Sequence, residues 1–323
     1  MLSEVDMRID RAIPVVAMGG GHGLAATLTA LREITTDITA LVTVADDGGS
    51  SGRLRAEFGV LPPGDLRMAL AALCSDDEWG RGWARVLQHR FVSDGELNGH
   101  SVGNLLLTAL WEIYEDPVVG LMKVGELLRV VGRVLPMSAI PLEIEAEVRT
   151  SATSGSESAT TIVRGQSAVA LARGIIEQVR LIPDAPPTHP EALAAIDRAE
   201  WVTLGPGSWY SSVLPHVLLP ETRAALSSTK ARKLLLLNLK APHPGDEAAD
   251  LGAQGRLAFL HQHAPEVHFD VVLADPSILT KELTEYVHSL GASLEVRDLA
   301  HAPTSDQHDP KKVVSALREI MAR

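Results

Sequence analysis

The sequence predicts an α/β protein with a doubly wound, mostly parallel β-sheet. Three observations predict this class: short apolar runs without polar alternation, helical patterns that separate them, and a glycine-rich turn that joins the first run to the first helix. Parallel strands are covered by helices on both faces, so they read as continuous apolar runs. We expect a Rossmann-like architecture that carries an additional segment in its middle.

The N-terminal part of the chain shows this pattern first. Ile13–Met18 is an apolar run that stops at three glycines, and Leu24–Glu33 follows with leucines on one helical face. Ile38–Ala45 is a second apolar, β-branched run, and it ends at two aspartates. This order predicts strand, glycine turn, helix and strand.

The same alternation returns in the C-terminal half. Apolar runs predict three further strands, and amphipathic patterns predict four helices. The strands are Trp201–Leu204, Lys233–Leu237 and Phe269–Ala274, and the helices are Pro190–Ala199, Ala248–His263, Lys281–Leu290 and Pro310–Met321. Both ends of the chain are therefore expected to contribute to one sheet.

The middle of the chain reads differently, because helical segments follow one another and short strand-like pieces come after them. The helical segments are Leu66–Leu73, Gly82–His89, Val102–Glu115 and Val118–Val131, and the strand-like pieces are Arg133–Pro136, Ile144–Arg149 and Thr160–Arg164. We predict a single domain over residues 1–323. Its Rossmann-like core comprises residues 12–75 and 190–323, and a helical and β-hairpin insertion spans about residues 76–189.

Composition limits the function classes. The 41 acidic and 29 basic side chains give a formal net charge of −12, which disfavours a nucleic acid as the main partner. The single cysteine, Cys74, leaves no pair for a disulfide and no thiolate cluster for zinc. The first apolar run is too short to cross a membrane. We expect a cytoplasmic protein without membrane insertion, and a homo-oligomer stays open.

The first candidate site is the glycine turn. Gly21, Gly23 and Ala26 form a G-x-G-x-x-A pattern between a strand and a helix, and Gly20 and His22 complete the turn. Backbone N–H groups at a helix N-terminus bind a phosphate where no Cβ intrudes. The turn therefore predicts phosphate or nucleotide contact, and a tight turn without a ligand is the alternative.

The second candidate follows the second strand, at the carboxyl edge where open α/β sheets place their ligands. It contains two carboxylates, two hydroxyls and an arginine, namely Asp46, Asp47, Ser50, Ser51 and Arg53. An acid at this point binds a ribose hydroxyl in dinucleotide enzymes, whereas two acids beside a phosphate bind Mg²⁺. Both interpretations place Asp46 and Asp47 in the site, and a solvated loop is the alternative.

Two further segments extend this region. Asp65 follows two prolines and a glycine, and it either caps the next helix or binds a ligand. Ser101 is a candidate helix N-cap, and Asn104 lies one turn into an apolar helix, where a buried amide needs a partner. Asn104 is therefore a candidate ligand contact. No G-x-S-x-G elbow accompanies Ser101, so we exclude a serine-triad hydrolase.

Another glycine-rich turn follows the strand Trp201–Leu204. Gly205 and Gly207 open the backbone there, and three hydroxyls crowd the next turn, from Ser208, Ser211 and Ser212. This arrangement is a second anion nest. Two nests on one sheet predict a ligand with a diphosphate, whose two ends bind in different loops of one crevice. Asn238, at the end of the leucine-rich strand, is expected on the same rim.

Six segments of the sequence carry a resemblance to a known family. They are GGGHGL, TVADDGGSSGRLR, LPPGDLRMAL, GHSVGNLLLTAL, LIPDAPPTHPEALAAI and LGPGSWYSSVLP. In this order they resemble the YvcK family of gluconeogenesis factors, within the superfamily of CofD-type 2-phospho-L-lactate transferases. The resemblance runs from Val15 to the C-terminal helix, and it leaves Glu78–Leu97 and the Ser/Thr-rich patch Thr150–Thr161 unsupported.

The resemblance implies a cytoplasmic bacterial protein that binds a nucleotide sugar, UDP-N-acetylglucosamine. It implies a role in cell shape and peptidoglycan precursor supply during growth on gluconeogenic carbon, exerted through regulatory protein partners and without a demonstrated turnover. By position, it implies that phosphate contacts Gly20, Gly21 and Gly23 in the first loop, and Gly207 and Ser208 in the second. It implies that the Asp46–Asp47 loop borders the ligand and that Asn104 contacts it. It also implies that Tyr286 lies near the nucleotide sugar.

Two residues and one segment depart from the family pattern. The first loop more often reads GGGTG, and His22 here removes a hydroxyl. An arginine commonly precedes the His-Asp pair near the C-terminus, and Gln307 stands there in this chain, which removes a charge-assisted contact. Lys240–Glu247 replaces a Met-Thr-Gln-Pro-Gly-Glu-Thr run. These changes leave open which nucleotide sugar is bound.

A second function class stays open. It is a CofD-type transferase that moves a phospholactyl-type group from a nucleoside diphosphate carrier to a deazaflavin alcohol, with Asp46 and Asp47 binding Mg²⁺. The ADDGGSSGR form and the low aromatic content, with 4 Phe, 5 Trp and 3 Tyr, favour the regulatory interpretation. An NAD-dependent oxidoreductase would lack a proton-transfer partner. Mg²⁺ is the one cofactor that these residues suggest.

Overall fold

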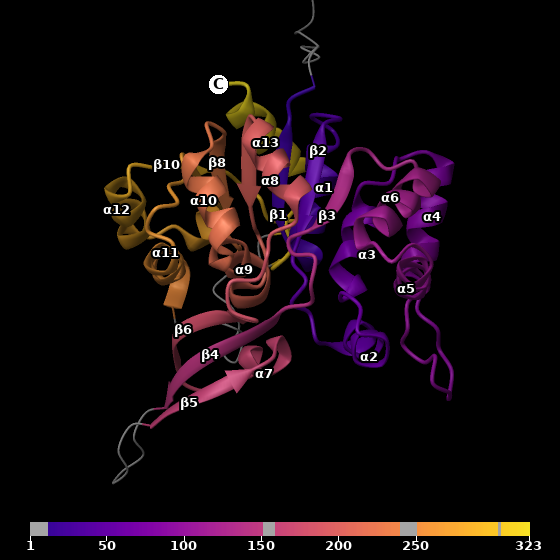
Figure 1. The fold of residues 1–323 in the computed structure, drawn as a ribbon. Helices are drawn as coiled ribbons and strands as arrows, with labels where there is room; N and C mark the ends of the chain where they lie inside the picture. The colour runs from indigo at the N-terminus through magenta and orange to yellow at the C-terminus, as the bar shows by residue number, and fades with distance from the viewer. Residues whose placement is uncertain (1–11, 151–158, 240–250, 303–304) are drawn as a thin grey trace, which may run out of the picture.

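A computed structural model describes residues 12–150, 159–239, 251–302 and 305–323. It contains a seven-stranded sheet with helices on both faces and a three-stranded sheet below it in the view of Figure 1. The predicted α/β class is confirmed. Within the described residues, no helix is both long and apolar enough to cross a membrane.

The main sheet is parallel throughout its described pairings. Its strands are β1 (Val15–Gly19), β2 (Ile38–Val42), β3 (Arg133–Pro136), β7 (Trp201–Leu204), β8 (Arg232–Leu236), β9 (Val271–Ala274) and β10 (Ser293–Val296). They lie in the order β10-β9-β8-β7-β1-β2-β3. The strand order therefore reverses between β1 and β7, and open α/β sheets bind ligands at the carboxyl ends of the strands at such a point.

Helices cover both faces of this sheet. On one side α1 (Gly21–Leu31) packs against α3 (Pro63–Ala72) and α13 (Pro310–Met321). On the other side α10 (Pro220–Ser228) packs against α8 (Pro190–Arg198) and α9 (Leu214–Leu218), and Figure 1 shows α8 and α10 in front of the strands. Every residue of β1, β2, β7 and β9 is buried, as continuous apolar runs predict.

The predicted succession of helices in the middle of the chain is confirmed. After α3 come α4 (Glu78–Gln88), α5 (Val102–Tyr114) and α6 (Pro117–Leu128), and these helices pack on one another beside β3. The strand β3 differs from the expectation, because it pairs with β2 at the edge of the main sheet and is not a separate part of the insertion.

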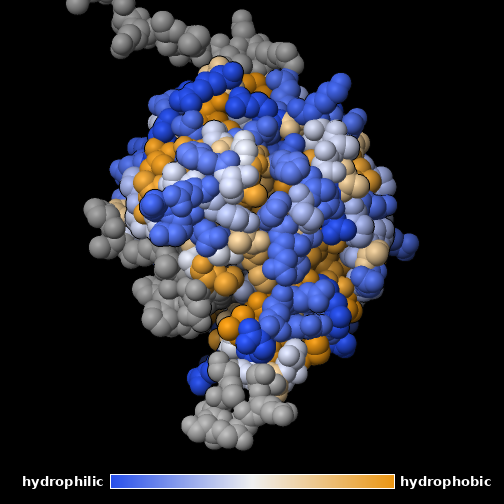
Figure 2. Space-filling model, turned by 90° about the vertical axis from the view of Figure 1, so that its left-hand side faces the viewer, coloured by the Kyte–Doolittle hydropathy of each residue, from blue (hydrophilic) through white to orange (hydrophobic). Residues whose placement is uncertain are grey.

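The small antiparallel sheet lies at the carboxyl edge of the main sheet. Its strands are β4 (Glu143–Thr150), β5 (Ala159–Arg164) and β6 (Ile175–Ile182), in the order β5-β4-β6, and α7 (Gln166–Ala170) follows β5. The buried Glu145 of β4 pairs with Arg164 of β5 and Arg180 of β6. Figure 2 shows apolar side chains gathered near this lower end of the molecule. Ile162 of β5 and Ile175 of β6 are exposed.

Several elements were not predicted. The largest is α2 (Gly49–Phe58), which begins inside the polar segment after β2. The others are β6, β10, α7 and α10, whereas the helix expected after the second glycine turn is present as the π-helical turn Trp209–Val213 and α9. The C-terminal helices α11 (Gly252–His263) and α12 (Lys281–Ser289) agree with the expected segments, and α11 begins four residues later.

Candidate functional site

Two glycine loops meet at the point where the strand order reverses. The first glycine loop (Gly19–Gly23) follows β1, and the second glycine loop (Gly205–Ser208) follows β7. A Cβ on Gly23 would overlap the Pro206 carbonyl oxygen and would lie 2.9 Å from Gly207 Cα. Thr27 of α1 donates its hydroxyl to the Gly205 carbonyl over 3.2 Å. The structure thus brings the two predicted anion nests side by side.

The first glycine loop leads directly into α1. Gly20 is the N-cap of this helix and has no capping side chain, so the helix N-terminus keeps backbone N–H groups that suit an anion. A Cβ on Gly20 would overlap the Asp65 carboxylate, so Gly20 is glycine because protein atoms pack there. Gly21 has a φ of +56°, and a Cβ there would lie 3.8 Å from Asp65 Oδ1; His22 is exposed beside it.

A buried histidine hydrogen-bonds to the backbone of the first glycine loop. His216 of α9 hydrogen-bonds through Nε2 to the Gly19 carbonyl over 3.2 Å, which makes Nε2 the protonated nitrogen of a neutral ring. Burial lowers the pKa of His216 to about 4, so the ring stays uncharged at neutral pH. The sequence analysis missed this residue, because a single histidine in a short helix gives no spacing signal.

The second glycine loop is held by side chains. Asn238, directly beyond the end of β8, accepts the Gly207 N–H over 3.0 Å and donates to the Gly207 carbonyl over 2.9 Å. Ser208 precedes the π-helical turn, and the Ser208 and Ser211 hydroxyls hydrogen-bond to each other. Thr43 donates its hydroxyl to the Ser211 carbonyl over 3.0 Å. Asn238 therefore lies on the expected rim, where it positions the backbone of Gly207.

The Asp65 carboxylate lies against the first glycine loop, and the charge of Asp46 acts on it; these two groups are called the carboxylate pair. Burial, followed by the charge of Asp46, raises the pKa of Asp65 to about 7, while a hydrogen bond with the Gly21 backbone works in the opposite direction. A Cβ on Gly64 would lie 3.1 Å from Asp46 Oδ2, so this glycine leaves room for the pair. Asp65 does not cap α3, whose N-cap is Pro62.

Asp47 contacts α7, the helix that follows β5 of the small sheet. Its Oδ1 accepts hydrogen bonds from the Ser167 N–H over 3.0 Å and the Ser167 hydroxyl over 2.7 Å. Asp46 itself accepts the Gly48 N–H over 3.0 Å, which shapes the turn into α2. The carboxylate whose charge acts on Asp65 is therefore that of Asp46, whereas the sequence had suggested that Asp46 and Asp47 act together.

The donor set of this pair fits Mg²⁺ with a bound phosphate. Two carboxylates are what Mg²⁺ takes from protein when phosphate and water oxygens complete its shell. No group of three or more His, Cys, Asp and Glu side chains that could hold a metal occurs among the residues described. A cation at Asp46 and Asp65 would therefore depend on oxygens of the ligand.

A buried polar network lies behind these carboxylates. The Asn104 amide donates to Ser50 Oγ over 3.0 Å and accepts from Arg67 Nε over 2.9 Å. Ser50 Oγ also contacts His100 Nδ1 over 3.0 Å, and Arg67 bonds to Gln88. Both ends of the Asn104 amide are thus used within the protein, and Asn104 links α2, α3 and α5.

Two neighbouring hydroxyls have structural partners. The Ser101 side chain accepts the Asn104 N–H over 3.4 Å, which confirms Ser101 as the N-cap of α5. Ser51 Oγ accepts the Gly64 N–H over 3.0 Å, so Ser51 joins the start of α2 to the start of α3. These contacts fix the segment that carries Asp46.

Two predicted site residues have their described contacts elsewhere. Arg53 donates to the carbonyls of Glu96 over 3.0 Å and Asn98 over 2.7 Å, so it fastens an exposed loop. Tyr286 lies in α12, near the opposite edge of the main sheet, and packs partly buried against the core. No described contact joins either residue to a glycine loop.

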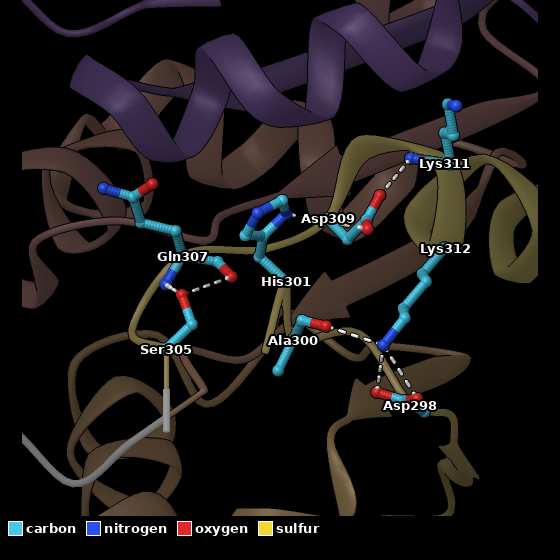
Figure 3. Close-up of polar contacts among 8 residues, drawn as sticks. All are labelled: Asp298, Ala300, His301, Ser305, Gln307, Asp309, Lys311 and Lys312. Atoms are coloured by element: carbon cyan, nitrogen blue, oxygen red, sulfur yellow. Dashed lines mark hydrogen bonds and ion pairs between the residues drawn. The ribbon is translucent and has the colours of Figure 1, made fainter. Parts of the chain in front are cut away.

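The C-terminal segment is drawn in Figure 3. Gln307 is exposed, and its backbone N–H donates to the Ser305 hydroxyl over 3.0 Å. Lys312 is held by Asp298 over 2.8 Å and by the Ala300 carbonyl over 2.7 Å, so its charge is already engaged. Asp309 caps α13. The other departure from the family pattern, Lys240–Glu247, lies outside the described residues.

Comparison with known proteins decides the family. A family model described as "2-phospho-L-lactate transferase CofD" matches residues 15–313. The chain belongs to the CofD family. Within this family, a "Putative gluconeogenesis factor" of Mycobacterium tuberculosis is 49% identical over 314 residues, which cover 96% of this chain and 90% of that protein. A "Gluconeogenesis factor" of Listeria monocytogenes is 34% identical over 269 residues, covering 83% of this chain and 79% of the relative.

A solved structure extends the comparison to the fold. The crystal structure of a UPF0052 family protein from Bacillus halodurans superimposes with a TM-score of 0.83 at 32% sequence identity. The match covers 95% of this chain and 99% of the other. This CofD-family member therefore has a fold similar to that of the UPF0052 family protein.

Proposed function

We propose that this protein binds a nucleotide sugar, UDP-N-acetylglucosamine, in the crevice between the two glycine loops. The observation that carries the proposal is the contact between these loops at the reversal of strand order. A diphosphate spanning the loops would meet the α1 N-terminus on one side and the backbone of Gly207 on the other. The identity of the sugar comes from the family resemblance.

Mg²⁺ is part of this proposal. Asp46 and Asp65 would hold the cation, and Mg²⁺ bridging to phosphate oxygens would neutralise charge on the diphosphate. Arg67 and Asn104 would keep the pair in place through the buried network. Asp47 and Ser167 would keep the small sheet against the same edge.

We propose a regulatory role for this binding, without turnover. The names of the relatives as gluconeogenesis factors support a role in gluconeogenic growth. The family resemblance adds cell shape, peptidoglycan precursor supply and regulatory protein partners in the cytoplasm. In this interpretation the nucleotide sugar is a signal, and the protein passes it to a partner.

Calorimetric titration of the full chain tests the proposal. The ligands are UDP-N-acetylglucosamine, GDP and NAD, each with and without Mg²⁺. We expect saturable binding of the UDP sugar that Mg²⁺ strengthens, and a loss of about tenfold in Asp65→Asn, equal to about 1.4 kcal/mol. Asp197→Asn, at an exposed position of α8, is the matched control. Absence of binding by the UDP sugar would refute the proposal.

A transferase is the second candidate, because the family model carries that description and the Asp46 and Asp65 pair suits a metal-assisted group transfer. In that case the chain would prefer GDP with Mg²⁺ over the UDP sugar. The same titration therefore separates the two functions.

A further inference from the structure

A cavity lies at the β3 edge of the main sheet, two strands from β1. Its volume is about 340 Å³, within the range of small-molecule sites in proteins. The walls are apolar and come from three elements: Leu70 of α3, Val118 and Leu121 of α6, and Val134 and Leu135 of β3. Figure 1 shows α3 and α6 beside β3. The cavity is therefore separate from the glycine loops.

The shape of the cavity follows from where α6 crosses the sheet edge. Gly125 of α6 lines the space, and a Cβ there would lie 3.2 Å from Val130 Cγ2. Gly132 precedes β3 with a φ of +86° and lines the cavity as well. A Cβ on Gly132 would overlap the Ile38 carbonyl oxygen, so Gly132 lets the start of β3 lie close to β2, and Gly125 lets α6 lie close to Val130.

The mouth of the cavity carries Arg129, whose charge also acts on Asp77 at the start of α4. Glu126 is engaged by Lys123 over 2.9 Å, and Glu191 is engaged by Arg133 over 2.9 Å. Arg129 also lines the mouth, and its guanidinium lies 5.1 Å from the centre of the Trp79 ring. Among the described residues no ion pair includes Arg129. One cation at the mouth therefore remains available to an anion in a chain of net charge −12.

We propose that this cavity binds a small apolar monocarboxylate, with the hydrocarbon body between α6 and β3 and the carboxylate at Arg129. Apolar walls with a single charged group at the rim are the pattern that holds and orients such a ligand. Met122, with 51% of its surface exposed, lies at the entrance. The proposal does not depend on the function proposed for the glycine loops.

The position of the cavity connects it to the glycine loops through one helix. Leu70 lies five positions after Asp65 on α3, which is about 7.5 Å along the helix axis. An occupant would therefore press on the helix that positions the carboxylate pair. A carboxylate bound here is well placed to alter the binding of the nucleotide sugar.

Calorimetric titration of the full chain with decanoate tests the site, with decanol as the uncharged analogue. We expect saturable binding of one decanoate per chain and at least tenfold weaker binding of decanol. Met122→Trp should weaken decanoate binding at least tenfold by filling the entrance, and Arg129→Gln should weaken it about fivefold.

The controls are exposed residues outside the cavity. Ile113→Trp adds the same ring to α5 at a position that is 69% exposed, and Lys281→Gln removes a charge from α12. Both should bind decanoate like the unaltered chain. Absence of saturable binding, equal losses in Met122→Trp and Ile113→Trp, or equal affinity for decanol would each overturn the proposal.

Discussion

The two glycine loops end neighbouring strands of one sheet, yet they are held in different ways. In the first loop the glycines are required because neighbouring protein atoms occupy the Cβ positions, with Asp65 against Gly20 and Pro206 against Gly23. In the second loop the Asn238 side chain hydrogen-bonds to both the N–H and the carbonyl of Gly207. A glycine-rich turn in a sequence therefore indicates that other atoms lie close to the backbone. At Gly20 and Gly23 these atoms belong to the protein itself and not to a ligand.

The largest expected effect tests the contact between the loops. Gly23→Ala places a methyl group on the Pro206 carbonyl, so we expect the free energy of unfolding to fall by about 3 kcal/mol. Gly82→Ala is the matched control, because Gly82 is exposed on α4 with open space around its Cβ position. It should raise stability by up to about 1 kcal/mol. Urea denaturation measures both, and an unchanged Gly23→Ala would contradict the contact.

The next effect concerns the carboxylate that fills the first loop. The pKa of Asp65 is raised from 3.8 to about 7, so the folded state binds more protons than the unfolded state between these values. Stability should therefore fall as the pH rises from about 4 to about 7. Asp65→Asn lacks this penalty, and its stability advantage over the unaltered chain should grow by about 2 kcal/mol between pH 5 and pH 8. A constant difference across that range would show that Asp65 ionises without cost.

The smallest effect concerns His22, which is exposed in the first turn of α1. His22→Thr restores the hydroxyl that the family pattern places there. Because no described contact holds the imidazole, the free energy of unfolding should change by less than about 0.5 kcal/mol. Affinity for UDP-N-acetylglucosamine should rise by a few fold, and calorimetry measures it. A large loss of stability would mean that the first loop depends on this side chain.

The sequence predicted the sheet and the places where its loops end. Ile38–Ala45 and Trp201–Leu204 could be recognised because strands buried on both faces are apolar throughout. The sequence did not predict α2, because Gly48, Gly49 and Gly52 have low helix propensity and the helix is anchored by distant contacts such as Ser51 with Gly64. The short edge strand β10 was not predicted either, because Glu295 interrupts its apolar run.

The sequence predicted which residues belong to the candidate site, but it predicted only in part which of them interact with one another. Both glycine loops, Asp46 and Asp65 were named from residue type and place along the chain. That the charge of Asp46 acts on Asp65, while Asp47 binds Ser167, depends on how the segment with α7 meets the carboxyl edge. No local pattern encodes a contact across 120 positions of the chain. The same holds for His216 beneath Gly19.

The central claim is that the two glycine loops form one binding site, and Asn238→Ala tests it most directly. This change releases Gly207 and leaves the first loop and the carboxylate pair intact. Calorimetric titration with UDP-N-acetylglucosamine and Mg²⁺ should show affinity at least tenfold below that of the unaltered chain, with a cooperative thermal transition retained. Equal affinity in a folded Asn238→Ala protein would contradict the claim, since the first loop alone would then account for binding.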